Sequence, residues 1–269
     1  MNVDHSNGWW LVLPAAGFGR RMGLATPKQY LEIAGRSILE ITLSRFAGVS
    51  GLNAVFLVHG PQARERIDTD RLSALIDHVP VFPVPGGQTR ADSVRFGLSF
   101  FRQHWQTLFR LTSDYSADEI AATWANQTVL VHDAARPCVR PDDIRQLLAE
   151  YSPEHGALLG APVNETVKEI NTAGQVEHTR DRRYLMRALT PQCFPVGALY
   201  EALCQARAEG VEVTDESSAL ERLGWHPRIV RGATDNIKVT HPEDLDLARV
   251  ILERQGVLRR LTNTERADF

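Results

Sequence analysis

Short apolar runs alternate with longer amphipathic stretches along this chain of 269 residues, and this alternation restricts its possible folds more than any other feature. Continuous apolar runs are typical of strands buried on both faces of a parallel sheet, and amphipathic stretches between them are typical of helices that cover such a sheet. The pattern therefore predicts an α/β fold in three layers, with a mostly parallel central sheet between helices. The predicted strands are Trp9–Leu13, Ala54–Val58, Val79–Val84, Val129–Val131 and Ala157–Leu159, and the predicted helices are Arg64–Ile76, Ala91–Trp105, Pro141–Tyr151 and Val196–Glu209.

The charge balance and the cysteines exclude several classes of protein. Thirty basic residues against 33 acidic ones give a net charge of −3, which argues against a general nucleic-acid binder. Three cysteines, none in a CxxC pair, do not make a disulfide framework. The N-terminus lacks a basic signal-peptide region, and the longest uncharged stretch, residues 46–63, is interrupted by glycines and a proline. We expect a cytoplasmic protein with no membrane contact and no nucleic-acid partner.

Two segments depart from the alternation. Residues 166–179 alternate around the turn residues Asn171–Gly174, which predicts an antiparallel hairpin that is too polar for a central strand. Such a hairpin is marginal alone, so we expect it to pack on something, such as a second subunit. Residues 106–127 carry no motif and have the character of an insertion, in which Ser116–Glu119 is a capping box for a short helix. Another capping box, Thr240–Glu243, predicts the start of the last helix.

The first predicted strand leads directly into a glycine-rich loop, Pro14–Gly23. Small residues let backbone N–H groups approach a phosphate chain closely, although a tight turn with solvated arginines is the simpler alternative. The fingerprint GxGxxG fails because Met22 stands at its last position, and the P-loop pattern fails because no Gly-Lys-Ser/Thr follows. What remains is a glycine loop with its own cations, which suits a triphosphate whose charge rises during reaction. These cations are Arg20, Arg21 and, a few residues on, Lys28.

Two further loops follow predicted strands, where α/β sheets bind their ligands. Gly86 and Gly87 precede a helix and let the backbone approach a flat ligand, and Ser93 can offer a hydroxyl; such a glycine pair is commonly only a turn. Asp133 ends a buried strand, which is the usual place for a carboxylate that holds Mg²⁺ beside phosphates. Arg136 could balance Asp133, whose alternative role is to cap the following turn.

Three polar segments in the second half of the chain are further candidates for the site. Arginines within residues 180–183 could hold a substrate phosphate bidentately. Thr214 and Asp215 could be only a helix N-cap. Asp235–Thr240 has the pattern of a strand with an inward or end-placed lysine, Lys238. Because no HExxH, GxSxG or Cys–His signature occurs in the sequence, we expect electrostatic chemistry carried by Arg, Lys and a metal, without a protein nucleophile.

Only three of the 30 basic residues are lysines, namely Lys28, Lys168 and Lys238. A genomic bias toward arginine explains the rest. Lys28 and Lys238 fall in motifs where a compact point charge would meet phosphate oxygens, and Lys168 lies on the predicted hairpin.

These motifs, in this order and spacing, closely resemble the 2-C-methyl-D-erythritol 4-phosphate cytidylyltransferase family of the non-mevalonate isoprenoid pathway. The resemblance covers residues 11 to about 250, and VHDAARP with DNIKVT is more specific than PAAGxGxRM, which also marks related nucleotidyltransferases. It implies a Rossmann-like sheet in a single nucleotidyltransferase domain (1–269), a β-arm at 163–187 for substrate binding and dimerisation, a homodimer, CTP and Mg²⁺. The matching stretches are PAAGFGRRM…PKQY, GGQTRADS, VHDAARP, APVNETVK, HTRDRRYL…ALTPQ, TDESSALE and DNIKVTHPEDL.

The resemblance also implies a reaction and the residues that serve it. CMP would be transferred from CTP to 2-C-methyl-D-erythritol 4-phosphate, and pyrophosphate would leave. Arg21 and Lys28 would stabilise the transition state, Arg182 and Lys238 would position methylerythritol phosphate, and Asp133 would assist the metal. The implied nucleotide-binding residues are Pro14, Ala15, Ala16, Gly17, Gly19, Gly87, Ser93, Ala134 and Arg136, and the implied substrate-binding residues are Thr166, Asp181, Thr190, Thr214 and Asp215.

Two features depart from the family pattern, and three other functions compete with the implied one. Gln88 stands where many members carry Asp, and residues 106–127 are longer than usual, which predicts a surface excursion.

A cytidylyltransferase for another polyol phosphate, such as ribitol 5-phosphate, would differ in the arm and around Arg182. A non-catalytic nucleotide sensor would be expected to have lost Lys28, Asp133 or Lys238, and all three are present. A NAD-dependent dehydrogenase is disfavoured at the glycine loop by its failed GxGxxG fingerprint.

Overall fold

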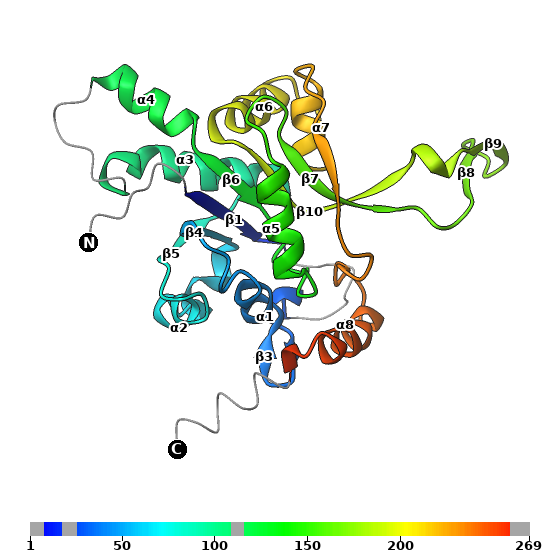
Figure 1. The fold of residues 1–269 in the computed structure, drawn as a ribbon, viewed down its shortest axis with the longest axis horizontal. Helices are drawn as coiled ribbons and strands as arrows, with labels where there is room; N and C mark the ends of the chain where they lie inside the picture. Colours follow the sequence, from blue (N-terminus) through cyan, green and yellow to red (C-terminus); the bar gives the residue numbers. More distant parts are fainter. Residues whose placement is uncertain (1–7, 18–25, 109–115, 259–269) are drawn as a thin grey trace.

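The computed structural model describes residues 8–17, 26–108 and 116–258, and this part of the chain is built on a seven-stranded sheet (Figure 1). The strand order is β11-β7-β10-β6-β1-β4-β5, and all neighbouring pairs are parallel except the two that β10 makes with β6 and β7. The predicted three-layer, mostly parallel α/β fold is thus confirmed. The strands of this sheet are β1 (Trp9–Ala15), β4 (Leu52–His59), β5 (Val81–Pro85), β6 (Thr128–Val131), β7 (Ala157–Pro162), β10 (Met186–Pro195) and β11 (Arg228–Arg231). The α-helices are α1 (Ile38–Ser44), α2 (Thr69–Ala74), α3 (Arg90–Leu108), α4 (Ala117–Ala125), α5 (Pro141–Glu150), α6 (Val196–Ala208), α7 (Glu216–Glu221) and α8 (Glu243–Arg254).

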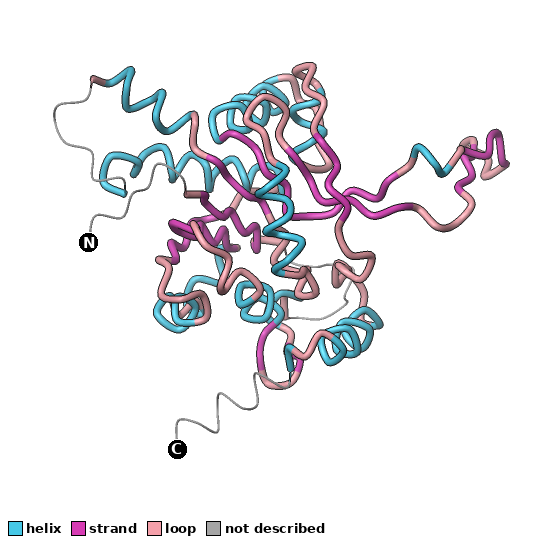
Figure 2. The backbone as a smooth tube through the Cα atoms, viewed as in Figure 1, coloured by secondary structure: helices cyan, strands magenta, loops and turns pink. Residues whose placement is uncertain are grey.

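The central strand β1 divides the hydrophobic core between the two faces of the sheet. Its side chains alternate, so that Leu11 and Leu13 join one cluster with α1, α2 and α5, while Trp10 and Val12 join another with α3 and α6. All four side chains are buried. Figure 2 shows the strands of this sheet at the centre with helices around them, and the two clusters cover β1 on both faces.

A third, smaller cluster fixes the last helix near the carboxyl end of the sheet. Ile38 and Ile41 of α1 pack with Ala248 and Leu252 of α8, and Val239, from the loop before α8, is buried among them. The loop that carries Lys238 is therefore held in place by apolar contacts at Val239, the residue next to it.

The predicted hairpin is confirmed as β8 (Val167–Ile170) and β9 (Val176–Arg180), which pair antiparallel and project away from the sheet as an arm (Figure 1). A short 3₁₀ helix, η5 (Arg182–Tyr184), follows β9 and leads back to β10. Among the described residues, most side chains of this arm are exposed, including the large apolar ones of Ile170, Val176 and Tyr184.

The expected surface excursion at 106–127 is correct only in part. The predicted capping box between Ser116 and Glu119 is present at the start of α4, most of whose residues are exposed. Trp124, however, is buried, and its ring lies 5.6 Å from that of Tyr200 on α6 in an edge-on arrangement. The helix is therefore docked on the core through one large aromatic side chain.

Three local predictions are wrong. The helix predicted over Arg64–Ile76 is broken into a 3₁₀ helix, η4 (Pro61–Arg66), and α2, because Asp68 accepts a hydrogen bond from the Arg71 N–H and starts a new helix. Asp235–Thr240 is a loop and not a strand. Thr240–Glu243 forms no capping box, since the Asp244 carboxylate instead accepts the N–H groups of Thr240 and His241. The alternation of apolar and polar residues does not by itself distinguish a broken helix from a continuous one, or a loop from a strand.

In the part of the chain that the structure describes, none of the helices combines the length and the apolar character needed to cross a membrane.

Candidate active site

Asp133 lies just beyond the end of β6, and three cationic side chains converge on its carboxylate. Arg90 Nε lies 2.7 Å from Oδ1, while Lys238 Nζ and Arg136 Nε lie 2.9 and 3.2 Å from Oδ2. Burial alone would raise the pKa of Asp133, but the charges of Arg90, Lys238 and Arg136 outweigh burial and hold that pKa well below its usual range. A permanently charged carboxylate thus fixes the positions of three cations.

Arg90 connects Asp133 to a second buried carboxylate. It is the first residue of α3, and its two terminal nitrogens lie 2.6 and 3.0 Å from the two carboxylate oxygens of Glu216, at the start of α7. Burial opposes the charge on Arg90, but Glu216 and Asp133 together raise its pKa above the usual value. We refer to Asp133, Arg90, Arg136, Lys238 and Glu216 as the Asp133 cluster.

Asp133 is also oriented through its backbone by a relay of neutral groups. The Asp133 N–H donates to Thr190 Oγ1 at 3.2 Å, and Thr190 Oγ1 lies 2.9 Å from His132 Nδ1. His132 Nε2 lies 3.2 Å from the carbonyl of Arg136, which can only accept, so Nε2 carries the proton and Nδ1 accepts from the Thr190 hydroxyl. Burial is the main reason that the pKa of His132 falls to about 3, and the ring is therefore neutral at physiological pH.

The loop that carries Lys238 is tied down on both sides of this residue. Arg136 Nη1 donates to the Asn236 carbonyl at 2.9 Å, and Asn236 Nδ2 donates to the Thr190 carbonyl at 2.8 Å. On the other side, Lys28 Nζ donates to the Val239 carbonyl at 2.8 Å. Two of the three lysines of the chain therefore meet at one short segment, next to the Asp133 cluster.

The start of the glycine loop lies against the loop that opens α3. Gly86 allows this approach, because a Cβ at that position would lie 2.4 Å from the Cβ of Ala16. The Gly87 N–H donates to Ser93 Oγ at 3.2 Å, so the two predicted nucleotide-binding loops meet beside a buried serine. The segments that follow β1 and β5 thus lie close together at the carboxyl ends of these strands.

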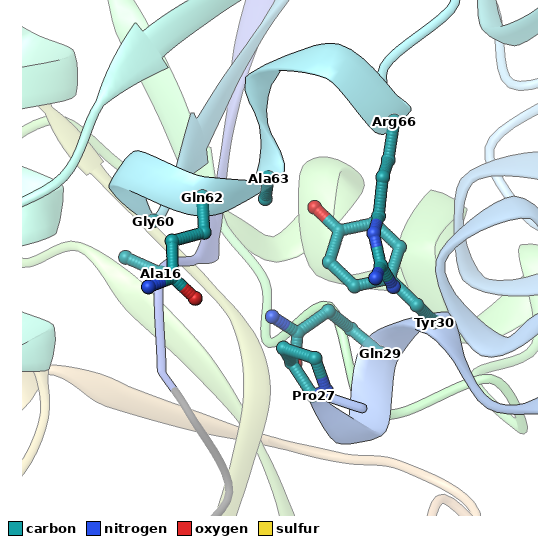
Figure 3. A pocket seen from close by; sticks show the side chains of 8 residues that line it. All are labelled: Ala16, Pro27, Gln29, Tyr30, Gly60, Gln62, Ala63 and Arg66. Atoms are coloured by element: carbon teal, nitrogen blue, oxygen red, sulfur yellow. The ribbon is translucent and has the colours of Figure 1, made fainter. Parts of the chain in front are cut away.

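Gln29, which sequence reasoning left without a role, holds the other side of the glycine loop. Its amide Nε2 donates to the carbonyl of Ala15 at 2.5 Å and to that of Gly17 at 3.3 Å, and the side chain is buried. Figure 3 shows Gln29 beside a pocket of about 100 Å³, across which Tyr30 and Arg66 face Ala16. The pocket therefore borders the described part of the glycine loop.

Comparison with known proteins assigns this arrangement to a family. Residues 10–110 and 110–254 match the sequence model of the 2-C-methyl-D-erythritol 4-phosphate cytidylyltransferase family. The chain belongs to this family. Cytidylyltransferases of this name from Hahella chejuensis and Chromohalobacter salexigens are 42% and 43% identical to it, over 91% and 94% of this chain and 93% of each relative.

Solved structures of cytidylyltransferases agree with this assignment. A 4-diphosphocytidyl-2C-methyl-D-erythritol synthase is 31% identical, with a TM-score of 0.69, over 91% of this chain and 98% of its own. The 2-C-methyl-D-erythritol 4-phosphate cytidylyltransferase of Francisella tularensis is 29% identical, with a TM-score of 0.66, over 91% of this chain and 100% of its own. The fold therefore extends over nearly the whole length of these proteins.

The predicted site residues of the cytidylyltransferase fall into separate groups. Asp133, Arg136 and Lys238 meet in the Asp133 cluster. Lys28 lies close to it, because Lys28 donates a hydrogen bond to the carbonyl of Val239, the residue after Lys238. Gly19 and Arg21 lie outside the described residues. Ala134, next to Asp133, is buried. Pro14 and Ala15 end β1, Ala16 and Gly17 follow it, Gly87 precedes α3, and Ser93 lies in the first turn of α3.

The residues predicted on the arm are not joined to the cluster by any contact within the described residues. Arg182 donates to the Asn164 carbonyl, and Asp181 accepts from Arg183, so both bond within the arm itself. Thr166 is exposed on the same arm. Arg182 is nevertheless exposed to solvent.

Asp215, predicted as a substrate residue, is the N-cap of α7, which is the other role that the sequence left open. Its carboxylate accepts from the Ser218 N–H at 2.9 Å and from Gln192 Nε2 at 2.8 Å, and Thr214 beside it is exposed. Neither Arg90 nor Glu216 was singled out from the sequence. Their only signal was their place inside the motifs GGQTRADS and TDESSALE.

The donor set at Asp133 fits a divalent cation that arrives with phosphates. Mg²⁺ in phosphate-transfer sites is usually held by one or two carboxylates together with substrate phosphates. Asp133 supplies one such carboxylate, and the described segments contain no group of three His, Cys, Asp or Glu side chains that could hold a metal by itself. Both oxygens of Asp133 face cations, so a metal ion would share this carboxylate with Arg90, Arg136 or Lys238.

Proposed function

We propose that this cytidylyltransferase transfers the cytidylyl group of CTP to 2-C-methyl-D-erythritol 4-phosphate and releases pyrophosphate. The observation that carries the proposal is the Asp133 cluster, in a chain whose family bears this activity in its name. The cluster has three cations against two carboxylates, which leaves one net positive charge at the carboxyl end of β6. Such a site suits the approach of one phosphate to another, where repulsion between anions is the main obstacle.

The attacking group requires no base from the protein. A phosphate monoester has its second pKa near ~6, so the substrate phosphate is already mostly ionised at neutral pH. His132 is buried and neutral, with both ring nitrogens used inside the protein, which agrees with a structural role. The residues therefore act by position and charge: Lys238 aligns the attacking phosphate, and Lys28 and Arg21 stabilise the negative charge that grows on the triphosphate.

Mg²⁺ is part of the proposal, with Asp133 as its ligand from the protein. When bound, the metal ion would neutralise charge on the triphosphate. Asp133 is suited to this task because its low pKa keeps it charged in the whole physiological range. The glycine loop that follows β1 and the Gly86–Gly87 turn before α3 would lie against the nucleotide, as the family resemblance implies.

A homodimer that uses the arm is also part of the proposal. Ile170 and Val176 face each other across the hairpin, and each is 58% exposed. A two-stranded hairpin with exposed apolar side chains is marginal alone, so a second copy is a suitable cover. An arm held by a partner could also bring Arg182 and Thr166 to a substrate phosphate, as the family resemblance implies.

Pyrophosphate release from CTP, measured with purified protein and excess Mg²⁺, tests the proposed function. We expect turnover with 2-C-methyl-D-erythritol 4-phosphate, and at least about a hundredfold lower kcat/KM with ribitol 5-phosphate, because bound hydroxyls and phosphate must match the site. Equal or better turnover with ribitol 5-phosphate, or none with either polyol phosphate, would contradict the proposal.

A further inference from the structure

Glu216 is a buried carboxylate for which the proposed reaction has no direct use. Its side chain is 1% exposed, and both of its oxygens are bound by the guanidinium of Arg90. A buried charge is costly without a partner of opposite sign, so Glu216 and Arg90 hold each other firmly. The Glu216–Arg90 ion pair is thus in direct contact with Asp133, the proposed metal ligand.

Arg90 uses all three of its guanidinium nitrogens, and they serve two different carboxylates. Nη1 and Nη2 bind Glu216, and Nε binds Asp133 Oδ1 at 2.7 Å. The guanidinium is planar, so fixing two of its nitrogens on Glu216 also fixes the direction in which Nε points. The plane of Arg90 therefore decides how the Asp133 carboxylate can rotate.

Glu216 is in turn anchored to the central sheet. It begins α7, whose N-cap Asp215 is bound by Gln192 of β10, and the Ser217 N–H donates to Gln192 Oε1 at 2.9 Å. Gln192 is fully buried. The position of Glu216 is thus fixed by the central sheet. Arg90, which binds both carboxylates, in turn fixes Asp133 relative to Glu216.

We infer that Glu216 and Arg90 are a positioning pair: they hold Asp133 Oδ1 so that Oδ2 stays aimed at Lys238, the residue that aligns the attacking phosphate. This inference rests on the proposed function and adds two residues to it. Glu216 also limits the attraction of Arg90 for Asp133, because two of the three guanidinium nitrogens of Arg90 are bound to Glu216. Without the charge of Glu216, Arg90 is free to bind Asp133 with two nitrogens and to compete with Lys238 for it.

Glu216→Gln tests the pair, since it removes the charge but nearly conserves the shape. We expect kcat to fall about tenfold or more, while KM for CTP stays within about twofold, because alignment of the attacking group is lost and nucleotide binding is not. We expect a crystal structure of this variant to show Lys238 Nζ beyond hydrogen-bond distance of Asp133 Oδ2. An unchanged kcat, or an unchanged Lys238 contact in that structure, would overturn the inference.

A second comparison separates positioning from general damage. In a Lys238→Ala background the added change Glu216→Gln should cost less than about twofold in kcat, because the group through which it acts is already missing. A merely structural role for Glu216 predicts the same loss in both backgrounds, and that result would also overturn the inference.

The controls keep the outcome interpretable. Glu150→Gln removes a carboxylate that pairs with Arg228 at 2.9 Å, away from the Asp133 cluster, and should leave kcat and KM unchanged. If Glu216→Gln does not fold, Glu216→Asp retains the charge but withdraws it by one methylene, and the same two readouts apply. Absence of turnover in the unaltered protein would contradict the proposed function, while the structural readout on Lys238 would still test the pair.

Discussion

Asp133 shows how one carboxylate can organise a site for anions. Arg136 has a planar fork that reaches both Asp133 and the Asn236 carbonyl, so it ties two loops together. Lys238 contributes a compact point charge on a flexible stem, 35% exposed, which can turn toward a ligand. Arg90 and Arg136 therefore fix the loops around Asp133, while Lys238 keeps a terminal amine that can reach a ligand. This difference gives a physical reason for a lysine rather than an arginine at Lys238.

Lys28→Ala is expected to lower kcat by about a hundredfold and to leave the fold intact. Removing one preorganised cation from a developing negative charge costs on the order of 3 kcal/mol in the barrier. The variant also loses the bond to the Val239 carbonyl, next to Lys238, which adds to the effect. Initial rates of pyrophosphate release, together with far-UV circular dichroism, measure both parts, and a kcat near that of the unaltered protein would exclude this role.

His132 is expected to make stability depend on pH in a defined direction. Its folded pKa of about 3 lies below the unfolded value near 6.5, so its contribution is complete above pH 6.5 and is lost as pH falls toward 3. The loss amounts to about 1.4 kcal/mol per pH unit in that window. Urea unfolding at pH 6 and pH 5 should show a steeper decline for the unaltered protein than for His132→Gln. Parallel declines would contradict the buried, neutral ring.

At the scale of helices and strands, the sequence predicts the buried strands correctly but does not predict the Asp235–Thr240 loop. The strands β1, β4 and β6 stand out as apolar runs because they are buried on both faces. Asp235–Thr240 was mistaken for a strand because Ile237 and Val239 alternate with polar residues, yet its bonds go to Ala135, Thr190 and Arg136 rather than to a neighbouring strand.

The sequence predicts those parts of the candidate site that directly follow a strand of the sheet. Asp133 and the two glycine loops follow strands whose carboxyl ends share one edge, and their proximity follows from that topology. The pairing of Arg90 with Glu216, 126 positions away in sequence, depends on how α3 and α7 pack, and no local pattern encodes it. Arg90 and Glu216 therefore required the structure.

Trp124→Ala is expected to destabilise the protein by about 3–5 kcal/mol without changing kcat. The side chain is 5% exposed, lies against Tyr200, and receives the guanidinium of Arg102 at 5.5 Å from its ring. Such a truncation leaves a cavity in the helical layer, away from the Asp133 cluster. Urea unfolding measures the loss. Asp118→Asn, on the exposed face of α4, serves as the matched control and should cost less than about 1 kcal/mol.

For the whole molecule, the arm is the feature that a single copy leaves uncovered (Figure 1). If it packs on a second copy, Ile170→Lys combined with Val176→Glu should shift the protein from dimer to monomer in light scattering. Opposite charges across this pair preserve the hairpin itself, so only the surface changes. Leu247→Lys with Val250→Glu changes two apolar residues of α8 that are 50% and 40% exposed, and this control should leave the mass unchanged. A monomeric unaltered protein, or the same shift with both pairs, would count against the arm.

The bond from Lys28 to the Val239 carbonyl joins residues 211 positions apart. During synthesis at about 5–20 residues per second, the ribosome adds Val239 roughly 10 to 40 seconds after Lys28. Lys28 therefore emerges long before the carbonyl to which it donates, and Asp133 emerges long before Lys238. A nascent chain accordingly cannot form these two contacts until residues 238 and 239 have been made.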